Sequence, residues 1–250
     1  METNIIFFEE VDSTNDCLRR MAAEGAEEGL VVHAATQTSG KGRRGRVWES
    51  AKKDNLYFSI LLRPEMTPNQ APMLTLVMAY AVAKVLEKKS GVCPQIKWPN
   101  DILVAGKKVC GILTEMFLKG SKIDFIVLGC GVNVNQMAFS QELESKATSL
   151  KCATGIQWDA QKLLQEILET FGCWYSVFLQ EGNLGFLQED YNQLLVNRER
   201  EVLVQEPERE YTAFAKGINA AGELVVKRED GSEECVFAGE VSVRGIYGYV

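Results

Sequence analysis

The segment from residue 102 to residue 128, ILVAGKKVCGILTEMFLKGSKIDFIVL, contains three apolar runs whose pattern favours strands. The runs, 102–104, 108–116 and 123–128, are separated by the turn-forming pairs Ala105-Gly106 and Lys119-Gly120. Turns this short join antiparallel neighbours, whereas parallel strands need a crossover of a dozen or more residues. The segment therefore predicts an antiparallel meander and favours an α+β fold over a βαβ arrangement.

The flanking sequence predicts helices on either side of this meander. Pro72 opens an apolar helical pattern that ends near Gly91, and residues 158–179 repeat leucine and aromatic side chains at helical spacing. The N-cap residues of the segment 12–15 predict a short helix that stops at Gly25. A mixed, largely antiparallel sheet flanked by helices follows, with additional strands at 5–8, 30–36 and 56–62.

From about Arg200 the pattern changes to short strands alone, at 202–204, 211–216, 224–226, 236–237 and 241–243. Turn signals at 219–222 and 230–231 separate several of them. Five short strands in so few residues predict a small closed β-barrel. We therefore expect two domains, 1–197 and 198–250, with a boundary near Asn197 that depends on the change of pattern alone.

Composition excludes several classes of protein. The 250 residues are 46% hydrophobic and 24% charged, which is typical of a globular chain. No apolar run approaches the roughly 18 residues of a membrane span, and the acidic N-terminus is no signal peptide, so we expect a cytoplasmic protein. The single histidine, His33, excludes multi-histidine metal sites and is interpreted as packing. Seven cysteines without a C-x-x-C pair predict reduced core thiols.

The net charge of −7 argues against a general affinity for nucleic acid, but one loop is strongly basic. Residues 40–46, GKGRRGR, carry Lys41, Arg43, Arg44 and Arg46. Glycines allow backbone N–H groups to approach phosphate oxygens, and guanidinium groups contact phosphate bidentately. The functional interpretation is a mobile lid that becomes ordered over a small, dense anion. The alternative is a solvated basic surface loop or a nucleic-acid-binding patch. The dinucleotide and kinase patterns that this loop matches lack their required context.

Three further clusters follow the basic loop. The first, 97–101, ends at Asp101, a carboxylate that could hold Mg²⁺. The second, 108–115, places Lys108 at the start of a strand in which Gly111 allows a ligand to approach closely. The third, 129–135, ends another strand with two glycines and two amides. Each could be an ordinary structural feature, but their combination indicates a site.

These motifs, in this order, closely resemble those of the biotin protein ligases, which attach biotin to carboxylase carrier domains. The resemblance covers nearly the whole chain and extends to 13–15, Gln37 and 239–244. It implies a class II synthetase-like catalytic domain and an SH3-like C-terminal barrel. Lys41 departs from the arginine of many members. The N-terminus also leaves no room for a helix-turn-helix domain, so the resemblance implies a monofunctional ligase without DNA binding.

The resemblance also implies a two-step reaction. The biotin carboxylate attacks the α-phosphorus of ATP to form biotinyl-5′-AMP, and a lysine of a biotin carboxyl carrier protein then displaces AMP. Lys108 and Arg43 are the implied catalytic residues, and Asp101 is the implied Mg²⁺ ligand. The implied biotin-binding residues are Ser13, Thr14, Asn15, Gln37, Lys41, Gly42, Arg43, Lys108 and Gly111. The implied ATP-binding residues are Arg43, Arg46, Trp48, Asn100, Asp101, Lys108, Asn133, Glu240 and Arg244.

Two alternatives remain at this stage. A lipoate or octanoate protein ligase or transferase shares the fold and the lysine, and a non-enzymatic nucleic-acid-binding module would use the basic loop alone. Edges of the predicted sheet could pair with a second copy, so the sequence leaves a homodimer open.

Overall fold

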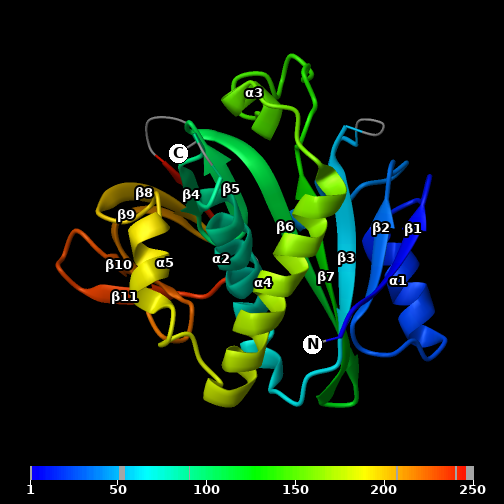
Figure 1. Ribbon diagram of the computed structural model, residues 1–250. Helices are drawn as coiled ribbons and strands as arrows, with labels where there is room; N and C mark the ends of the chain where they lie inside the picture. Colours follow the sequence, from blue (N-terminus) through cyan, green and yellow to red (C-terminus); the bar gives the residue numbers. More distant parts are fainter. Residues whose placement is uncertain (1, 51–53, 90, 207, 240, 246–250) are drawn as a thin grey trace.

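The structure, a computed structural model, describes residues 2–50, 54–89, 91–206, 208–239 and 241–245 (Figure 1). A seven-stranded sheet has the order β1-β2-β3-β7-β6-β5-β4, and a five-stranded sheet has the order β11-β10-β9-β8-β12. The large sheet lies between helices, and the small sheet lies beside the β4 edge (Figure 1). The α+β class with a small C-terminal β domain is therefore confirmed.

In the large sheet only β1 and β2 pair in parallel, and every other neighbouring pair is antiparallel. The predicted meander β5–β6–β7 is confirmed, and its first turn uses positive φ angles at Ala105 and Gly106. β4 was not predicted because a single strong apolar residue, Ile96, lies between its proline and its lysine. The strands are β1 Asn4–Phe8, β2 Leu30–Ala34, β3 Leu56–Leu62, β4 Pro94–Lys97, β5 Asp101–Val104, β6 Lys107–Lys119 and β7 Lys122–Val132.

Two long helices cover one face of this sheet and a short helix covers the other (Figure 1). α4 begins where the Asp159 carboxylate accepts hydrogen bonds from two backbone N–H groups, and it ends at Gly182 in the left-handed region. The predicted helices are α1 Thr14–Ala23, α2 Met73–Glu87 and α4 Ala160–Glu181. α3 (Leu150–Thr154) and α5 (Gln188–Leu194) were missed because five and seven residues are too few to show helical periodicity.

Two apolar cores lie on opposite faces of the large sheet. α2 is buried almost all round, and it packs with α4 against the sheet, which explains why its pattern is continuously apolar. α1 instead buries one stripe, including Leu18 and Ala22, against Val32, Leu61 and Val127. The N-terminal end of α1 is thereby fixed against the middle of the sheet, where the candidate site lies.

The C-terminal strands are β8 Arg200–Gln205, β9 Glu210–Ile218, β10 Leu224–Lys227, β11 Glu233–Val236 and β12 Ser242–Gly245. Trp98, almost fully buried, joins this sheet to the large one. Its indole Nε1 donates to the Gly222 carbonyl oxygen at 3.1 Å, and its backbone N–H donates to Asn197 Oδ1 at 3.0 Å. The Trp98–Pro99 peptide bond is cis. The 97–101 cluster therefore has a structural role as well as a place in the site.

The cysteine prediction is partly wrong. Cys110 and Cys130 are buried, but Cys93, Cys152, Cys173 and Cys235 are exposed, since they lie on polar faces and loops that the sequence interpretation ignored. His33 is partly buried, its ring centroid lies 5.3 Å from that of Phe7, and burial lowers its pKa, which is consistent with the predicted packing role. Within the described ranges, every helix is too short or too polar to cross a bilayer.

Candidate functional site

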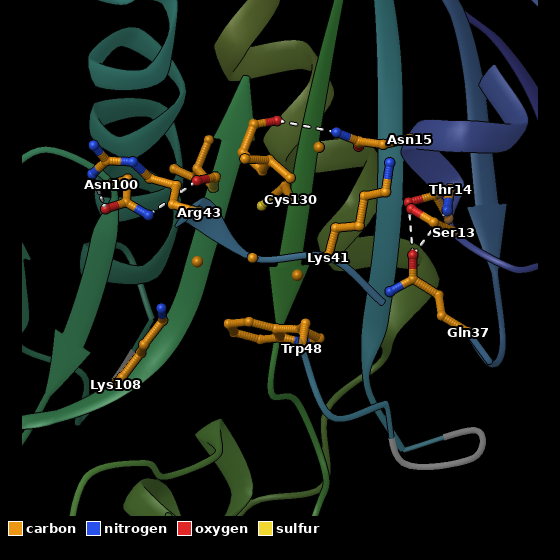
Figure 2. Close-up of a pocket in the computed structure, with 16 residues that line it drawn as sticks. Ser13, Thr14, Asn15, Gln37, Lys41, Arg43, Trp48, Asn100, Lys108 and Cys130 are labelled. Atoms are coloured by element: carbon orange, nitrogen blue, oxygen red, sulfur yellow. Dashed lines mark hydrogen bonds between the residues drawn. The ribbon is translucent and has the colours of Figure 1, made fainter. Parts of the chain in front are cut away.

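Two adjoining cavities lie where β6 and β7 meet the basic loop, and they share Gly42, Arg43, Trp48, Asn100 and Lys108. The inner cavity, of about 50 Å³, contains every residue predicted for biotin: Ser13, Thr14, Asn15, Gln37, Lys41, Gly42, Arg43, Lys108 and Gly111 (Figure 2). The outer cavity, of about 770 Å³, is lined by Arg43, Arg46, Trp48, Asn100, Asp101, Lys108 and Asn133, all predicted for ATP. The structure therefore places the predicted biotin set and all of the predicted ATP set except Glu240 and Arg244 in two adjoining cavities, and their roles stay predictions.

Three glycines form the floor of the inner cavity. Gly111 of β6 lies directly opposite Gly131 of β7, and Gly129 lies opposite Ser59 of β3. A Cβ atom on Gly111 or Gly131 would lie 2.6 or 2.9 Å from the Trp48 ring, and one on Gly129 would lie 2.0 Å from the Asn15 amide oxygen. Only glycine permits these approaches. Gly129 and Gly131 were visible as a motif, but no role was predicted for them.

Hydroxyl and amide groups enclose one end of the inner cavity (Figure 2). Gln37 Oε1 accepts from the Thr14 backbone N–H at 2.8 Å and from its hydroxyl at 3.1 Å. Ser59 Oγ lies 2.8 Å from Thr14 Oγ1 and 2.6 Å from Asn15 Oδ1. Ser59 was not predicted, because an isolated serine in an apolar strand carries no signal. Such a set can both donate to and accept from a neutral polar group.

The predicted capping role of the segment 12–15 needs correction. Ser13 is the N-cap residue of α1 by its backbone, but its side chain makes no capping hydrogen bond. Thr14 and Asn15 instead direct their side chains to Gln37 and to Glu115, respectively. These residues share the short polar side chains that caps require, so sequence alone could not separate capping from a cavity wall.

Lys108 lies at the junction of the two cavities. Its Nζ is 2.7 Å from Asp101 Oδ1 and 5.0 Å from the centroid of the Trp48 ring. Its backbone is held on both sides, because Lys108 N donates to Lys146 O and its carbonyl accepts from Thr148 N. The side chains of Lys108 and Asp101 are 22% and 14% exposed. A cation fixed at this point would stabilise negative charge that develops between two bound molecules.

The basic loop folds back on itself. Gly42 N donates to Arg46 O at 2.7 Å, Trp48 N donates to Gly40 O at 2.9 Å, and Arg44 adopts a left-handed φ of 57°. The loop therefore has a closed, hairpin-like shape, which we call the flap (residues 40–48). Trp48 ends the flap, and its ring lies against Gly111 and Gly131 of the glycine floor. Its indole Nε1 is buried and has no hydrogen-bond partner among the described residues.

Arg43 holds the flap against the C-terminal sheet, an arrangement that the sequence did not predict. Its guanidinium donates to Asn100 Oδ1 at 3.0 Å and to the carbonyl oxygens of Gly239 and Val241 at 2.5 and 3.0 Å. Burial lowers the pKa of Arg43, and the Asp101 carboxylate acts in the opposite direction. Arginine remains charged in proteins, so a cation held mainly by neutral oxygens is available to an anion.

Of the remaining predicted ATP-binding residues, the structure describes the side chain of Asn133 but not those of Arg244 and Glu240. Asn133 is buried and lines the outer cavity, and its Nδ2 donates to Thr148 O at 3.1 Å. Arg244 lies in β12, but its side chain is not described, and Glu240 lies outside the described residues. Lys97, which is buried and lines the outer cavity, was part of a quoted motif without a predicted role.

A magnesium site was also predicted at Asp101. Among the described residues, no group of three or more histidine, cysteine or acidic side chains is placed to hold a metal ion. Mg²⁺ is usually bound by one or two carboxylates together with substrate phosphates. Asp101 alone therefore fits Mg²⁺ only as a joint ligand with a nucleotide.

The large mixed sheet, its glycine-floored cavity and the small antiparallel sheet define an α+β protein built to hold a small molecule beside an anion. Residues 7–133 match the biotin/lipoate A/B protein ligase family, and residues 199–244 match the biotin protein ligase C terminal domain. The chain therefore belongs to the biotin/lipoate A/B protein ligase family.

Known proteins similar to the chain agree with this assignment. The bifunctional ligase/repressor BirA of Bacillus spizizenii is 39% identical over 184 residues, which are 73% of this chain and 57% of that protein. The chain thus spans little more than half the length of that relative. The Escherichia coli protein of the same name is 30% identical over 236 residues, 94% of this chain and 72% of that protein. The structure of the biotin protein ligase from Aquifex aeolicus in complex with biotin and ATP matches with a TM-score of 0.85 at 31% identity, covering 97% of this chain and 99% of that one.

Proposed function

We propose that this chain is a biotin–[biotin carboxyl-carrier protein] ligase, which uses ATP to attach biotin to one lysine of a carrier domain through biotinyl-5′-AMP. The observation that carries the proposal is that the two cavities adjoin and share Lys108 in their linings. A polar cavity thus lies beside a fixed cation and a larger cavity lined by arginines. The Aquifex aeolicus ligase, solved in complex with biotin and ATP, supports this choice of ligands.

The enclosed end suits the urea group of biotin. A buried urea needs acceptors for two N–H groups and donors for its oxygen, and Ser13, Thr14, Asn15 and Gln37 offer both kinds. The glycine floor and Trp48 supply an apolar wall for the rest of the ligand. Since ligand cavities typically exceed about 300 Å³, the Trp48 ring must move away from the floor when biotin enters.

In the first step, a biotin carboxylate oxygen forms a bond to the α-phosphorus of ATP while the bond to pyrophosphate breaks. Lys108 at the cavity junction stabilises the charge on the carboxylate and α-phosphate oxygens without transferring a proton. In the second step, the neutral amine of the carrier lysine attacks the acyl carbon, AMP leaves, and the amine proton passes to solvent or phosphate. Both steps place negative charge beside Lys108.

The outer cavity receives the nucleotide in this proposal. Trp48 stacks on the adenine, Arg46 contacts the phosphates, and Asn100 and Asn133 contact the nucleotide. Asp101 is the residue that would hold Mg²⁺, which would screen the charge of the triphosphate. Arg43 has five N–H donors, so it can keep its carbonyl partners while the remaining donors contact phosphate, which couples nucleotide binding to flap closure.

Several other features extend the proposal. The domain division at 1–197 and 198–250 is proposed from the change in strand pattern, and the polypeptide partner is a biotin carboxyl carrier domain. Glu240 and Arg244 of the C-terminal part are proposed to reach the nucleotide. A cytoplasmic location, a homodimer and the absence of DNA binding stay predictions.

Mass spectrometry of the acyl-adenylate tests the choice of acid. The protein is incubated with ATP, Mg²⁺ and an equimolar mixture of biotin, lipoate and octanoate. Biotinyl-AMP as the dominant product is the expected result. Predominant lipoyl- or octanoyl-AMP would assign the chain to the lipoate branch of the family, and salt-sensitive oligonucleotide binding without any adenylate would favour the nucleic-acid module.

A further inference from the structure

One cation of the flap, Lys41, lines the inner cavity but not the outer cavity that is proposed to hold the nucleotide. Lys41 extends from the flap toward the first turn of α1, where Asn15 lies (Figure 2). Its Nζ is 2.6 Å from Asp16 Oδ1 and 3.8 Å from Glu115 Oε1. Asp16 belongs to α1 and Glu115 to β6, so Lys41 joins the flap to two elements of the rigid core.

The same ion-pair cluster is continuous with the polar end of the inner cavity. Glu115 Oε2 accepts from Asn15 Nδ2 at 2.7 Å, and Asn15 Oδ1 accepts from the Ser59 hydroxyl at 2.6 Å. The carboxylate that faces Lys41 therefore also orients an amide proposed to face biotin. Closing the flap and ordering the biotin-binding end are thus linked through shared hydrogen bonds.

We propose that Asp16 is a positioning residue, which with Glu115 latches Lys41 and thereby sets how long the flap stays closed over the acyl-adenylate. This inference rests on the proposed function for the identity of the retained molecule. It does not involve Asp16 in the chemistry, since Asp16 lines neither cavity. Its carboxylate reaches the flap through Lys41, and it also pairs within α1 with Arg19 Nε at 3.5 Å.

The flap is held at a second point, and the two attachments differ in their sensitivity to salt. Arg43 is part-buried and donates to neutral carbonyl oxygens. Lys41 is 39% exposed at its side chain and pairs with a full negative charge. Salt screens exposed ion pairs strongly, with a Debye length of about 3 Å at 1 M. Raising the salt concentration should therefore weaken the Lys41 latch and largely spare the Arg43 contacts.

The first test measures release of the intermediate. Labelled biotinyl-AMP is formed on the full chain, unlabelled biotin and ATP are added, and loss of label is followed at low and at high salt. Exposed ion pairs contribute about 0.2–1 kcal/mol, so Asp16→Asn should accelerate release about 1.4- to 5-fold at low salt. The salt dependence of release should shrink in the same variant. Asp16→Glu keeps the negative charge and should retain most of the salt dependence of release.

Arg20→Gln is the matched control for this experiment. It removes another exposed ion pair of α1, that between Arg20 and Asp12, without touching the flap. Its release rate should equal that of the unchanged chain. The latch is rejected if Asp16→Asn releases the adenylate at the unchanged rate, or if Arg20→Gln accelerates release equally.

A second test needs no ligand and separates the latch from the proposed function. Trypsin cleaves after lysine and arginine, so the cleavage rate within residues 41–46, mapped by mass spectrometry, reports how often the flap opens. Asp16→Asn should raise this rate about 1.4- to 5-fold, and Arg20→Gln should not. An unchanged tryptic rate in Asp16→Asn overturns the latch, whereas a faster rate in a chain that forms no biotinyl-AMP upholds the latch and rejects the proposed ligand.

Discussion

The glycine floor predicts that one added methyl group, in Gly129→Ala, disorders the biotin-binding end. The new Cβ would lie 2.0 Å from Asn15 Oδ1 and 2.9 Å from Asn15 Cγ. Ordinary contact begins near 3.4 Å, so the amide must retreat by roughly 1.4 Å. Asn15 is 4% exposed, and its retreat breaks the 2.6 Å hydrogen bond from Ser59 and the 2.7 Å bond to Glu115.

The expected magnitude follows from these two losses. Each hydrogen bond contributes about 0.5–1.5 kcal/mol, and the overpacking itself costs about 1–3 kcal/mol. We expect the free energy of unfolding to fall by about 2–6 kcal/mol. The dissociation constant for biotin should rise about tenfold or more, since a loss of 1.4 kcal/mol is tenfold. Urea denaturation measures the first quantity and isothermal titration calorimetry the second.

A double-mutant cycle with Asn15→Ala tests whether the collision is the cause. Alanine at position 15 lacks the amide that the new methyl group would meet, so Gly129→Ala should add little to its effect. Coupling of at least about 1 kcal/mol is expected, within the range measured for residues in contact. An equal penalty for Gly129→Ala in both backgrounds would show that the collision with the Asn15 amide is not the cause.

Three further predictions concern charged residues. Lys108→Ala should slow biotin-dependent pyrophosphate release by about 10²–10³, and a near-normal rate would reject its electrostatic role. Arg43→Gly should loosen the flap, so non-specific biotinylation of lysines on bystander proteins should rise; a variant that forms no adenylate would instead place Arg43 in the chemistry. The Arg20 side chain holds the pKa of Asp12 at about 2, below its ordinary 3.8. The stability that this exposed pair contributes, below about 1 kcal/mol, should be present above pH 3.8 and vanish as pH falls to about 2. Urea denaturation of Asp12→Asn against pH would contradict this if the difference persisted at pH 2.

Much of the fold could be predicted because its signals are local. The meander of 101–132 and the helices α2 and α4 are long enough to show their periodicity, and the glycine turns between them are unambiguous. β4, α3 and α5 are short, and their formation depends on neighbours that the sequence does not place beside them. Packing against the rest of the chain decides such elements.

The composition of the site could be predicted, but its contacts could not. The predicted residues come from segments far apart in sequence, and each segment could be recognised as a motif on its own. Three decisive contacts cross long sequence separations: Asn15 with Gly129, Arg43 with the Gly239 carbonyl, and Lys41 with Asp16. Local patterns carry no information about such contacts, since these depend on how the sheets and helices are assembled.

Transfer of biotin to a carrier domain is the most direct measurement of the whole account. The chain is mixed with biotin, ATP, Mg²⁺ and a purified biotin carboxyl carrier domain, and intact-protein mass spectrometry follows the carrier while released pyrophosphate is quantified. We expect one biotinyl adduct on a single carrier lysine, with pyrophosphate released only when biotin is present. A carrier that stays unmodified, with no biotin-dependent pyrophosphate, would contradict it.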